Sequence, residues 1–214
     1  MAVNLPKAPV RRGDAIVIRY PEDRVFSDAE LLSLSARNRH LRFERGPQGD
    51  LIVMSPTGGE SGRRNAELIF QLMLWAKRDG SGAVFESSGG FRLPDGAVRS
   101  PDAAWVRHER LSRLSQGERE RFLALAPDFV AELRSPTDDV EDLQAKMLEY
   151  RRNGVRLGWL LDPEARRVHV YAPDEVSVLE HPETVSGEPV LPGFELAVLE
   201  LWQASAHSIT PFAT

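Results

Sequence analysis

The sequence predicts an α/β or α+β protein, in which sheet strands stand both before and after the helices. Two observations lead to this fold class. Short runs rich in β-branched and aromatic residues are bounded by turn residues, which is typical of strands. Two longer segments repeat their apolar residues at intervals of three and four, which is typical of helices with one buried side. The length of 214 residues fits one domain, or two small ones.

The N-terminal part is expected to begin with an unstructured segment. Residues 1–14 contain two prolines and no periodicity, so we expect a flexible lead-in followed by a single domain over residues 15–214. A short helix is expected over residues 27–38, with Ser27 or Asp28 as its N-cap. The stretch "LRFERGPQGDLIVMSP" then places two strand-like runs around a turn, which predicts a hairpin.

The middle of the chain begins with the longest predicted helix, over residues 60–78. Asn65 falls on the apolar side of this helix. Short strands are expected at about 83–87 and 90–93, followed by a strand in the run from Pro101 to Val106.

The second half is expected to continue with a loop-rich helical region and then a strand over residues 128–134. Ser135 and Pro136 predict the start of a helix that runs from about 137 to 152. After it, "VRLGWLLDPEARRVHVY" predicts two strands joined by a turn, and "EVSVLE" predicts another strand.

Charge is unevenly distributed along the chain. The net charge is −5, but residues 173–200 carry seven acids and no Lys or Arg, so the rest of the chain is slightly basic. This distribution permits a nucleic-acid partner without requiring one. If the partner is a nucleic acid, the acidic segment should lie away from the cleft, because it would repel a phosphate backbone.

Composition also bears on the cellular location. No apolar run approaches the length that crosses a membrane, and the first residues lack the layout of a signal peptide. The chain has no cysteine, which excludes disulfides and thiolate metal sites. We therefore expect no membrane partner and a cytoplasmic location.

Three charges fall where buried surface is expected. In the strand 128–134, alternation puts Glu132 and Arg134 on the same face. Asp102 stands at the start of another apolar strand, and sheet pairing could bring it beside Glu132. Two carboxylates on one face repel each other unless a cation or a proton shares the site. A hard divalent ion, held by both carboxylates and a backbone carbonyl such as that of Leu133, is the usual solution.

Lys146 is a third candidate. Only three of the 27 basic residues are lysines, and Lys146 lies at the edge of the apolar side of its helix, one turn from Tyr150. Its ammonium could polarise a phosphate, hold a water molecule or neutralise the acids. The alternative is an exposed ion pair with Asp142, four residues earlier on the helix.

These residues also carry a resemblance. "SPDAAWV", "PDFVAELRSPTDD" and "DLQAKMLEYRRNGVRLGWLLDPEARRVHVY", in this order, resemble the Uma-type restriction endonuclease family of the PD-(D/E)XK nuclease superfamily. "LRFERGPQGDLIVMSP" and "GEPVLPGFEL" are also similar to that family. The resemblance implies a restriction-endonuclease-like α/β core, in which a mixed central β-sheet is flanked by helices, with additional N-terminal and C-terminal strands. It also implies that Asp102 is the aspartate of the Pro-Asp pair and Glu132 the acid of the following motif.

The chain departs from the superfamily at one position. Arg134 stands where a lysine is usual, and members of this family place the lysine on the following helix, which here is Lys146. Arginine does not give up its proton, so Lys146 would have to supply that role. Glu44 matches an acidic position of the family and is a candidate ligand for metal or water. Asn65 matches a polar position and is an auxiliary candidate.

We therefore expect a metal-dependent DNA endonuclease. Mg²⁺, or Mn²⁺, would be bound by Asp102, Glu132 and the Leu133 carbonyl, and Lys146 would position or activate water. DNA is the expected partner, and a homodimer is expected by analogy with such nucleases. The alternative is an inactive nuclease-like binding protein, in which a salt bridge from Arg134 to Glu132 or Asp102 fills the site.

Overall fold

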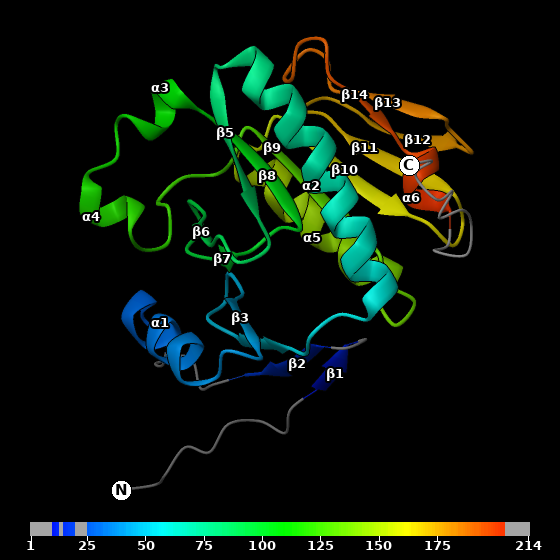
Figure 1. The fold of residues 1–214 in the computed structure, drawn as a ribbon. Coiled ribbons are helices and arrows are strands. Elements are labelled where there is room, and N and C mark those ends of the chain that lie inside the picture. The colour runs from blue at the N-terminus through cyan, green and yellow to red at the C-terminus, as the bar shows by residue number, and fades with distance from the viewer. Residues whose placement is uncertain (1–9, 13–14, 20–24, 204–214) are drawn as a thin grey trace, which may run out of the picture.

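The computed structural model describes residues 10–12, 15–19 and 25–203, and two six-stranded sheets dominate them (Figure 1). The N-terminal sheet has the order β1-β2-β4-β3-β7-β6, and every pair in it is antiparallel. Its strands are β1 (Val10–Arg12), β2 (Ala15–Ile18), β3 (Arg42–Arg45), β4 (Leu51–Met54), β6 (Phe91–Arg92) and β7 (Val98–Arg99).

The central sheet has the order β12-β11-β10-β9-β8-β5. Its strands β9 and β10 are parallel and the other neighbours are antiparallel, which confirms the predicted mixed sheet. Its strands are β5 (Gly82–Glu86), β8 (Ala103–Arg107), β9 (Phe129–Leu133), β10 (Leu157–Asp162), β11 (Arg167–Tyr171) and β12 (Val176–Glu180).

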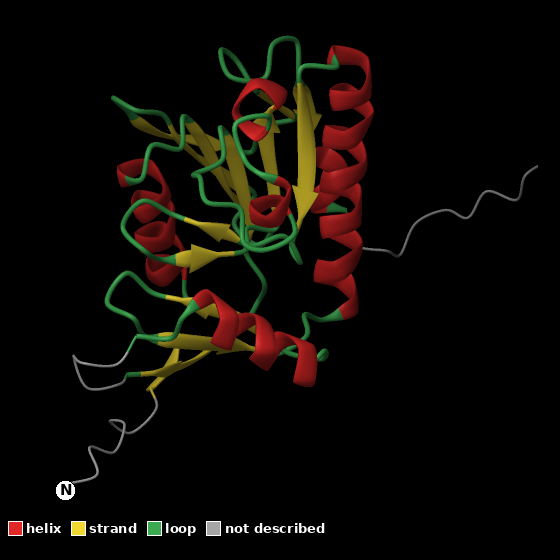
Figure 2. Ribbon diagram, turned by 90° about the vertical axis from the view of Figure 1, so that its left-hand side faces the viewer, coloured by secondary structure: helices red, strands yellow, loops and turns green. Residues whose placement is uncertain are grey.

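Two long helices cover the two faces of the central sheet (Figures 1 and 2). Helix α2 (Gly59–Asp79) packs its apolar side on one face, against residues such as Trp105 and Phe129. Helix α5 (Val140–Arg152) packs on the other face, against Ala104 and Val130. Strand alternation explains this arrangement, because neighbouring residues of β8 and β9 point to opposite faces.

The remaining elements are short. They are α1 (Asp28–Arg37), α3 (His108–Leu111), α4 (Gln116–Arg119), the hairpin of β13 (Thr184–Ser186) with β14 (Glu195–Ala197), and α6 (Leu199–Trp202). Helix α1 begins with a capping box between Ser27 and Glu30, as the sequence predicts. It packs against one face of the N-terminal sheet through Leu31, Phe43 and Leu51.

Two short strands differ from the predictions. Residues 10–12 belong to the predicted lead-in, yet they form β1, because their backbone pairs with β2. Strand β7 was not predicted, because two residues are too few to show alternation. The division into a lead-in and a single domain over residues 15–214 stays a prediction, and residues 1–9 and 13–14 lie outside the described residues.

The start of α5 also differs from its prediction. The N-cap is Asp139, whose carboxylate accepts hydrogen bonds from the backbone of Glu141 and Asp142. Ser135 instead begins a turn, in which its backbone N–H and hydroxyl donate to Asp138. The helix therefore begins at Val140, a few residues later than expected.

Candidate functional site

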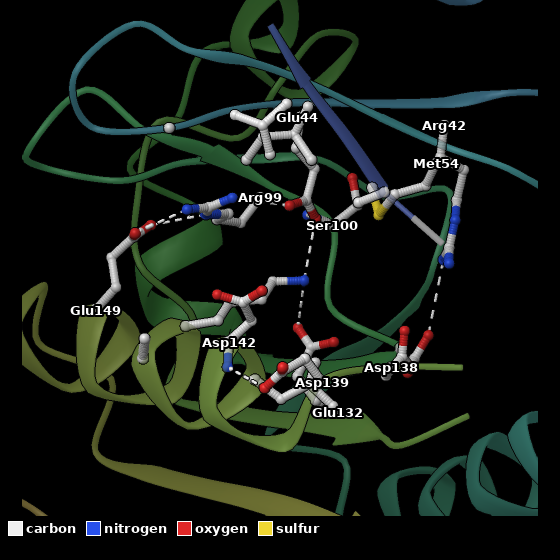
Figure 3. A pocket seen from close by; sticks show the side chains of 18 of the residues that line it. Arg42, Glu44, Met54, Arg99, Ser100, Glu132, Asp138, Asp139, Asp142 and Glu149 are labelled. Carbon is white, nitrogen blue, oxygen red and sulfur yellow. Dashed lines mark hydrogen bonds and ion pairs between the residues drawn. The ribbon is translucent and has the colours of Figure 1, made fainter. Parts of the chain in front are cut away.

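A pocket of about 410 Å³ lies where the N-terminal sheet meets the end of strands β8 and β9 (Figure 3). The inner face of the N-terminal sheet supplies one side, including Arg42, Glu44 and Met54. Glu132 and the segment before α5 supply the opposite side. The first turns of α2 and the exposed edge of α5 complete the lining.

Sheet pairing brings Asp102 and Glu132 to the same end of the central sheet. Ala103 pairs with Ala131 in the antiparallel register of β8 and β9, so one further step sets Asp102 across from Glu132. The backbone N–H of Leu133 donates to Asp102 Oδ2 at 2.9 Å, which closes this end of the ladder. Both acids line the pocket, and their exposed fractions are only 8% and 4%.

Lys146 lies between two carboxylates that come from different sheets. Its Nζ is 2.8 Å from Glu132 Oε1 and 3.1 Å from Glu44 Oε1. The hydroxyl of Tyr150, one turn later on α5, donates to the same oxygen of Glu132 at 2.9 Å. Asp102, Glu132, Lys146 and Glu44 therefore lie in one pocket, although they come from four separate elements.

The two glutamates have opposite protonation behaviour. Burial raises the pKa of Glu132 to about 7, and the charges of Asp102 and Glu44 add to this against the pull of Lys146. Burial would also raise the pKa of Glu44, but Lys146, Arg99 and the hydrogen bond from Ser100 together lower it to about 2. Glu44 is thus a fixed anion, while Glu132 can exchange a proton near neutral pH.

Arg99 holds Glu44 in place from behind. Its guanidinium donates two hydrogen bonds of 2.7 Å to the carboxylate of Glu149 and one of 3.0 Å to Glu44 Oε2. The backbone N–H of Ser100 donates to Glu44 Oε1 at 2.9 Å. Arg99, Glu44 and Glu149 are all buried, and the pKa of Arg99 is raised by its two acids against the effect of burial. The cluster is therefore an ordered, charge-assisted network.

Asn65 provides an oxygen beside Asp102. Its Nδ2 donates to Asp102 Oδ1 at 3.2 Å, and Arg42 lies 3.6 Å from the same oxygen. The Oδ1 atom of Asn65 is buried and accepts no hydrogen bond. A buried oxygen without a donor points to a missing partner, such as a water molecule or an ion.

Comparison with known proteins gives the family. The family described as "Putative restriction endonuclease", Uma2, matches residues 28–199, which is most of the chain. The chain belongs to the Uma2 family. This confirms the resemblance seen in the sequence.

A solved structure shares the fold of this Uma2 chain. It is described as a "putative nuclease belonging to DUF820" from Anabaena variabilis ATCC 29413. The TM-score is 0.65 at 22% sequence identity, over 75% of this chain and 89% of the other. The likeness confirms a nuclease-like fold. No curated protein matches the chain.

Arg134 of the Uma2 chain does not join the pocket. Its guanidinium lies 2.9 Å from Asp162 and 3.3 Å from Glu164. Strand β9 ends at Leu133, and the backbone of Arg134 continues the pairing with β10, which places the side chain next to Asp162, the last residue of β10. Arg134 thus pairs with Asp162 in place of Asp102 or Glu132.

The ligand set of the Uma2 pocket is small. Within the described ranges, no three His, Cys, Asp or Glu side chains form a group that could hold a metal ion. Any ion near Asp102 and Glu132 would therefore depend on backbone, amide and water oxygens as well.

The acidic segment 173–200 contributes no residue to the pocket lining, as predicted for a nucleic-acid site. None of the described helices is both long and apolar enough to span a membrane.

Sequence reasoning missed Arg99 and Glu149. One signal was present, since Glu149 is three residues from Lys146 and so neighbours it on α5. Arg99 lies three residues before Asp102, which shows only that it is near the site. Its partners Glu44 and Glu149 come from β3 and α5, so the sequence does not show the contacts of Arg99.

Proposed function

We propose that this Uma2 chain is a metal-dependent DNA endonuclease that hydrolyses phosphodiester bonds. The observation that carries the proposal is the meeting of Asp102, Glu132 and Lys146 in one pocket, with Lys146 Nζ 2.8 Å from Glu132. Two carboxylates and one ammonium at the end of a mixed sheet are the groups that the PD-(D/E)XK resemblance implies. Family membership supports the same reaction class.

The donor atoms fit a hard divalent ion. Asp102 and Glu132 would hold Mg²⁺ or Mn²⁺ with the Leu133 carbonyl, and the unpartnered Oδ1 of Asn65 is a further oxygen on the same side. These are all oxygen ligands, which Mg²⁺ and Mn²⁺ prefer. When bound, the ion would neutralise charge that develops on the scissile phosphate.

The protonation states support a positioning role for Lys146. Burial alone would lower the pKa of Lys146, but the negative charges of Glu132 and Glu44 raise it. The side chain therefore stays an ammonium at neutral pH. A permanent cation cannot take a proton from water, but it can hold a water molecule or a phosphate oxygen. Glu44, fixed by Arg99 and Ser100, keeps the ammonium in place.

Metal-dependent cleavage is the test of this function. Purified protein should nick or cut DNA with Mg²⁺ or Mn²⁺ and lose this activity with EDTA. Glu132→Ala should abolish both metal binding and cleavage, because the ion loses one of its two carboxylates. Glu195→Ala, on the exposed part of β14, is the matched control and should cleave like the wild type. Equal cleavage by wild type and Glu132→Ala would show that the activity is a contaminant.

The second candidate is an inactive binding protein with the same fold. It is favoured by the lack of three metal-ligating side chains within the described part of the chain. The placement of Arg134 outside the pocket counts against it, because the guanidinium of Arg134 pairs with Asp162 and does not fill the space between Asp102 and Glu132. Binding of DNA without cleavage in either metal would select this alternative. A homodimer and a cytoplasmic location stay predictions.

A further inference from the structure

The N-terminal sheet presents an apolar wall to the pocket, which we define as Val17, Ile52 and Met54. All three side chains line the pocket. The opposite face of this sheet packs on α1, but within the described residues none of the three apolar clusters of the protein includes a residue of the wall. Val17 is nonetheless only 7% exposed. The wall therefore faces the pocket instead of a protein core.

The wall lies beside the charged groups of the site. In the register of β3 and β4, Glu44 pairs with Ile52 and Arg42 pairs with Met54. Figure 3 shows Glu44, Arg42 and Met54 on one side of the pocket, with Glu132 on the opposite side. A ligand in the pocket would thus touch apolar side chains and an arginine on one side while it reaches the acids.

The acids lie deep within the pocket. Glu44 is 2% exposed and Glu132 is 4% exposed. A phosphodiester must enter between the wall and the end of the central sheet to reach them. The pocket volume of about 410 Å³ is at the small end of the range for ligand sites and suits one or two nucleotides. In a duplex, each base stays stacked and paired, so a base packs on the wall only after its nucleotide leaves the helix.

Building on the proposed nuclease function, we propose that the site takes an unpaired DNA strand. The base or sugar of a nucleotide packs on the wall, and its phosphate reaches the acids. Arg42, whose side chain is 34% exposed, contacts a neighbouring phosphate at the rim. An apolar packing surface beside a partly exposed arginine is a combination that proteins use to hold single strands.

Binding measurements separate this substrate from a duplex. The protein is titrated in Ca²⁺ into a fluorescently labelled single strand of 20 nucleotides, and separately into the duplex of the same sequence. The fluorescence anisotropy of the DNA gives the two affinities. The single strand should bind at least about tenfold tighter. The double variant Ile52→Ala/Met54→Ala should bind the single strand about tenfold more weakly, because it removes the apolar contacts of two side chains.

A matched variant controls for loss of folding. Val176→Ala/Val178→Ala truncates two exposed side chains of β12 and should bind like the wild type. The unfolding midpoint of each variant is measured alongside. Equal or tighter binding of the duplex, or wild-type affinity of a folded Ile52→Ala/Met54→Ala protein, would overturn the inference.

The outcomes distinguish the inference from the function on which it builds. Metal-dependent cleavage of duplex DNA, without any preference for a single strand, would overturn the unpaired-strand substrate and leave the nuclease function in place. Wall-dependent binding of the single strand, without cleavage in either metal, would support the binding site and overturn the nuclease function.

Discussion

The ammonium nitrogen of Lys146 lies 3.1 Å from Oε1 of Glu44, although 102 residues separate the two in the chain. This contact joins α5 to the N-terminal sheet across the pocket. It also directs the ammonium toward Glu132, 2.8 Å away, and so couples the two sides of the site. The same cation contacts an anion with a pKa of about 2 and an acid with a pKa of about 7.

Replacement of Lys146 should affect the chemical step more than metal binding. Lys146→Met keeps much of the side-chain volume but removes the charge that holds water or phosphate. We expect the single-turnover cleavage rate to fall by about 100-fold or more. Metal affinity, measured by calorimetry, should change by only a few fold, because the ion is held by the carboxylates.

The matched control for this variant is Lys77→Met, since Lys77 is an exposed lysine of α2 outside the pocket. Its cleavage rate should equal that of the wild type. A loss of metal binding in Lys146→Met, as large as in Glu132→Ala, would contradict a role for Lys146 in the chemical step alone.

The raised pKa of Glu132 predicts a pH-dependent loss of stability in the metal-free protein. Because burial favours the neutral form, its pKa rises from 4.5 to about 7 on folding. The stability that the neutral form contributes is fully present below pH 4.5 and is lost as the pH rises through about 7. Glu132→Gln stays neutral, so it should gain stability relative to the wild type over this range, by about 3 kcal/mol.

Urea unfolding in EDTA at pH 5 and pH 8 measures this difference. The comparison between the two proteins removes the contributions of titrating groups that do not interact with Glu132. A constant difference in the free energy of unfolding between pH 5 and pH 8 would show that the pKa of Glu132 is not raised by folding.

Removal of Arg99 should strongly lower the free energy of unfolding. Arg99→Ala leaves Glu149 and Glu44 buried without their guanidinium, and we expect a loss of about 3–5 kcal/mol in the free energy of unfolding. The double variant Arg99→Met/Glu149→Leu removes both buried charges of the bidentate pair and should lose less than Arg99→Ala. Urea unfolding provides the measurement.

An exposed ion pair is the control for Arg99. Arg167 lies 2.8 Å from Glu180, and both side chains are about half exposed (50% and 53%). Arg167→Ala should cost much less than Arg99→Ala, because solvent screens this exposed pair. If Arg99→Ala costs no more than Arg167→Ala, the buried network does not stabilise the site.

Arg134 should be replaceable without loss of activity. Its partners are Asp162 and Glu164, outside the pocket lining. Arg134→Lys restores the residue usual in the superfamily, and we expect its cleavage rate to stay within about twofold of the wild type. Arg134→Ala should lower the unfolding midpoint, because the nearly buried Asp162 loses an ion pair, while cleavage continues. A large loss of cleavage in a folded Arg134→Lys protein would place this residue in the reaction.

Much of the local structure was predictable from the sequence. The helix at α2 and the hairpin of β3 and β4 were confirmed, because hydrophobic periodicity and turn residues report local geometry. The start of α5 was wrong, since Ser135 and Asp139 are both good caps and the choice depends on the turn that Asp138 closes.

By itself, the sequence determined most of the secondary structure and the candidates Asp102, Glu132 and Lys146, because acids in apolar strands and a rare lysine stand out against a regular pattern. Only the tertiary structure decided that Arg99 binds Glu149 and Glu44, and that Arg134 turns to Asp162. The physical reason is that an ion pair forms with the nearest suitable charge in space. That neighbour is set by which strands and helices pack together, over separations of 28 to 102 residues that local periodicity does not encode.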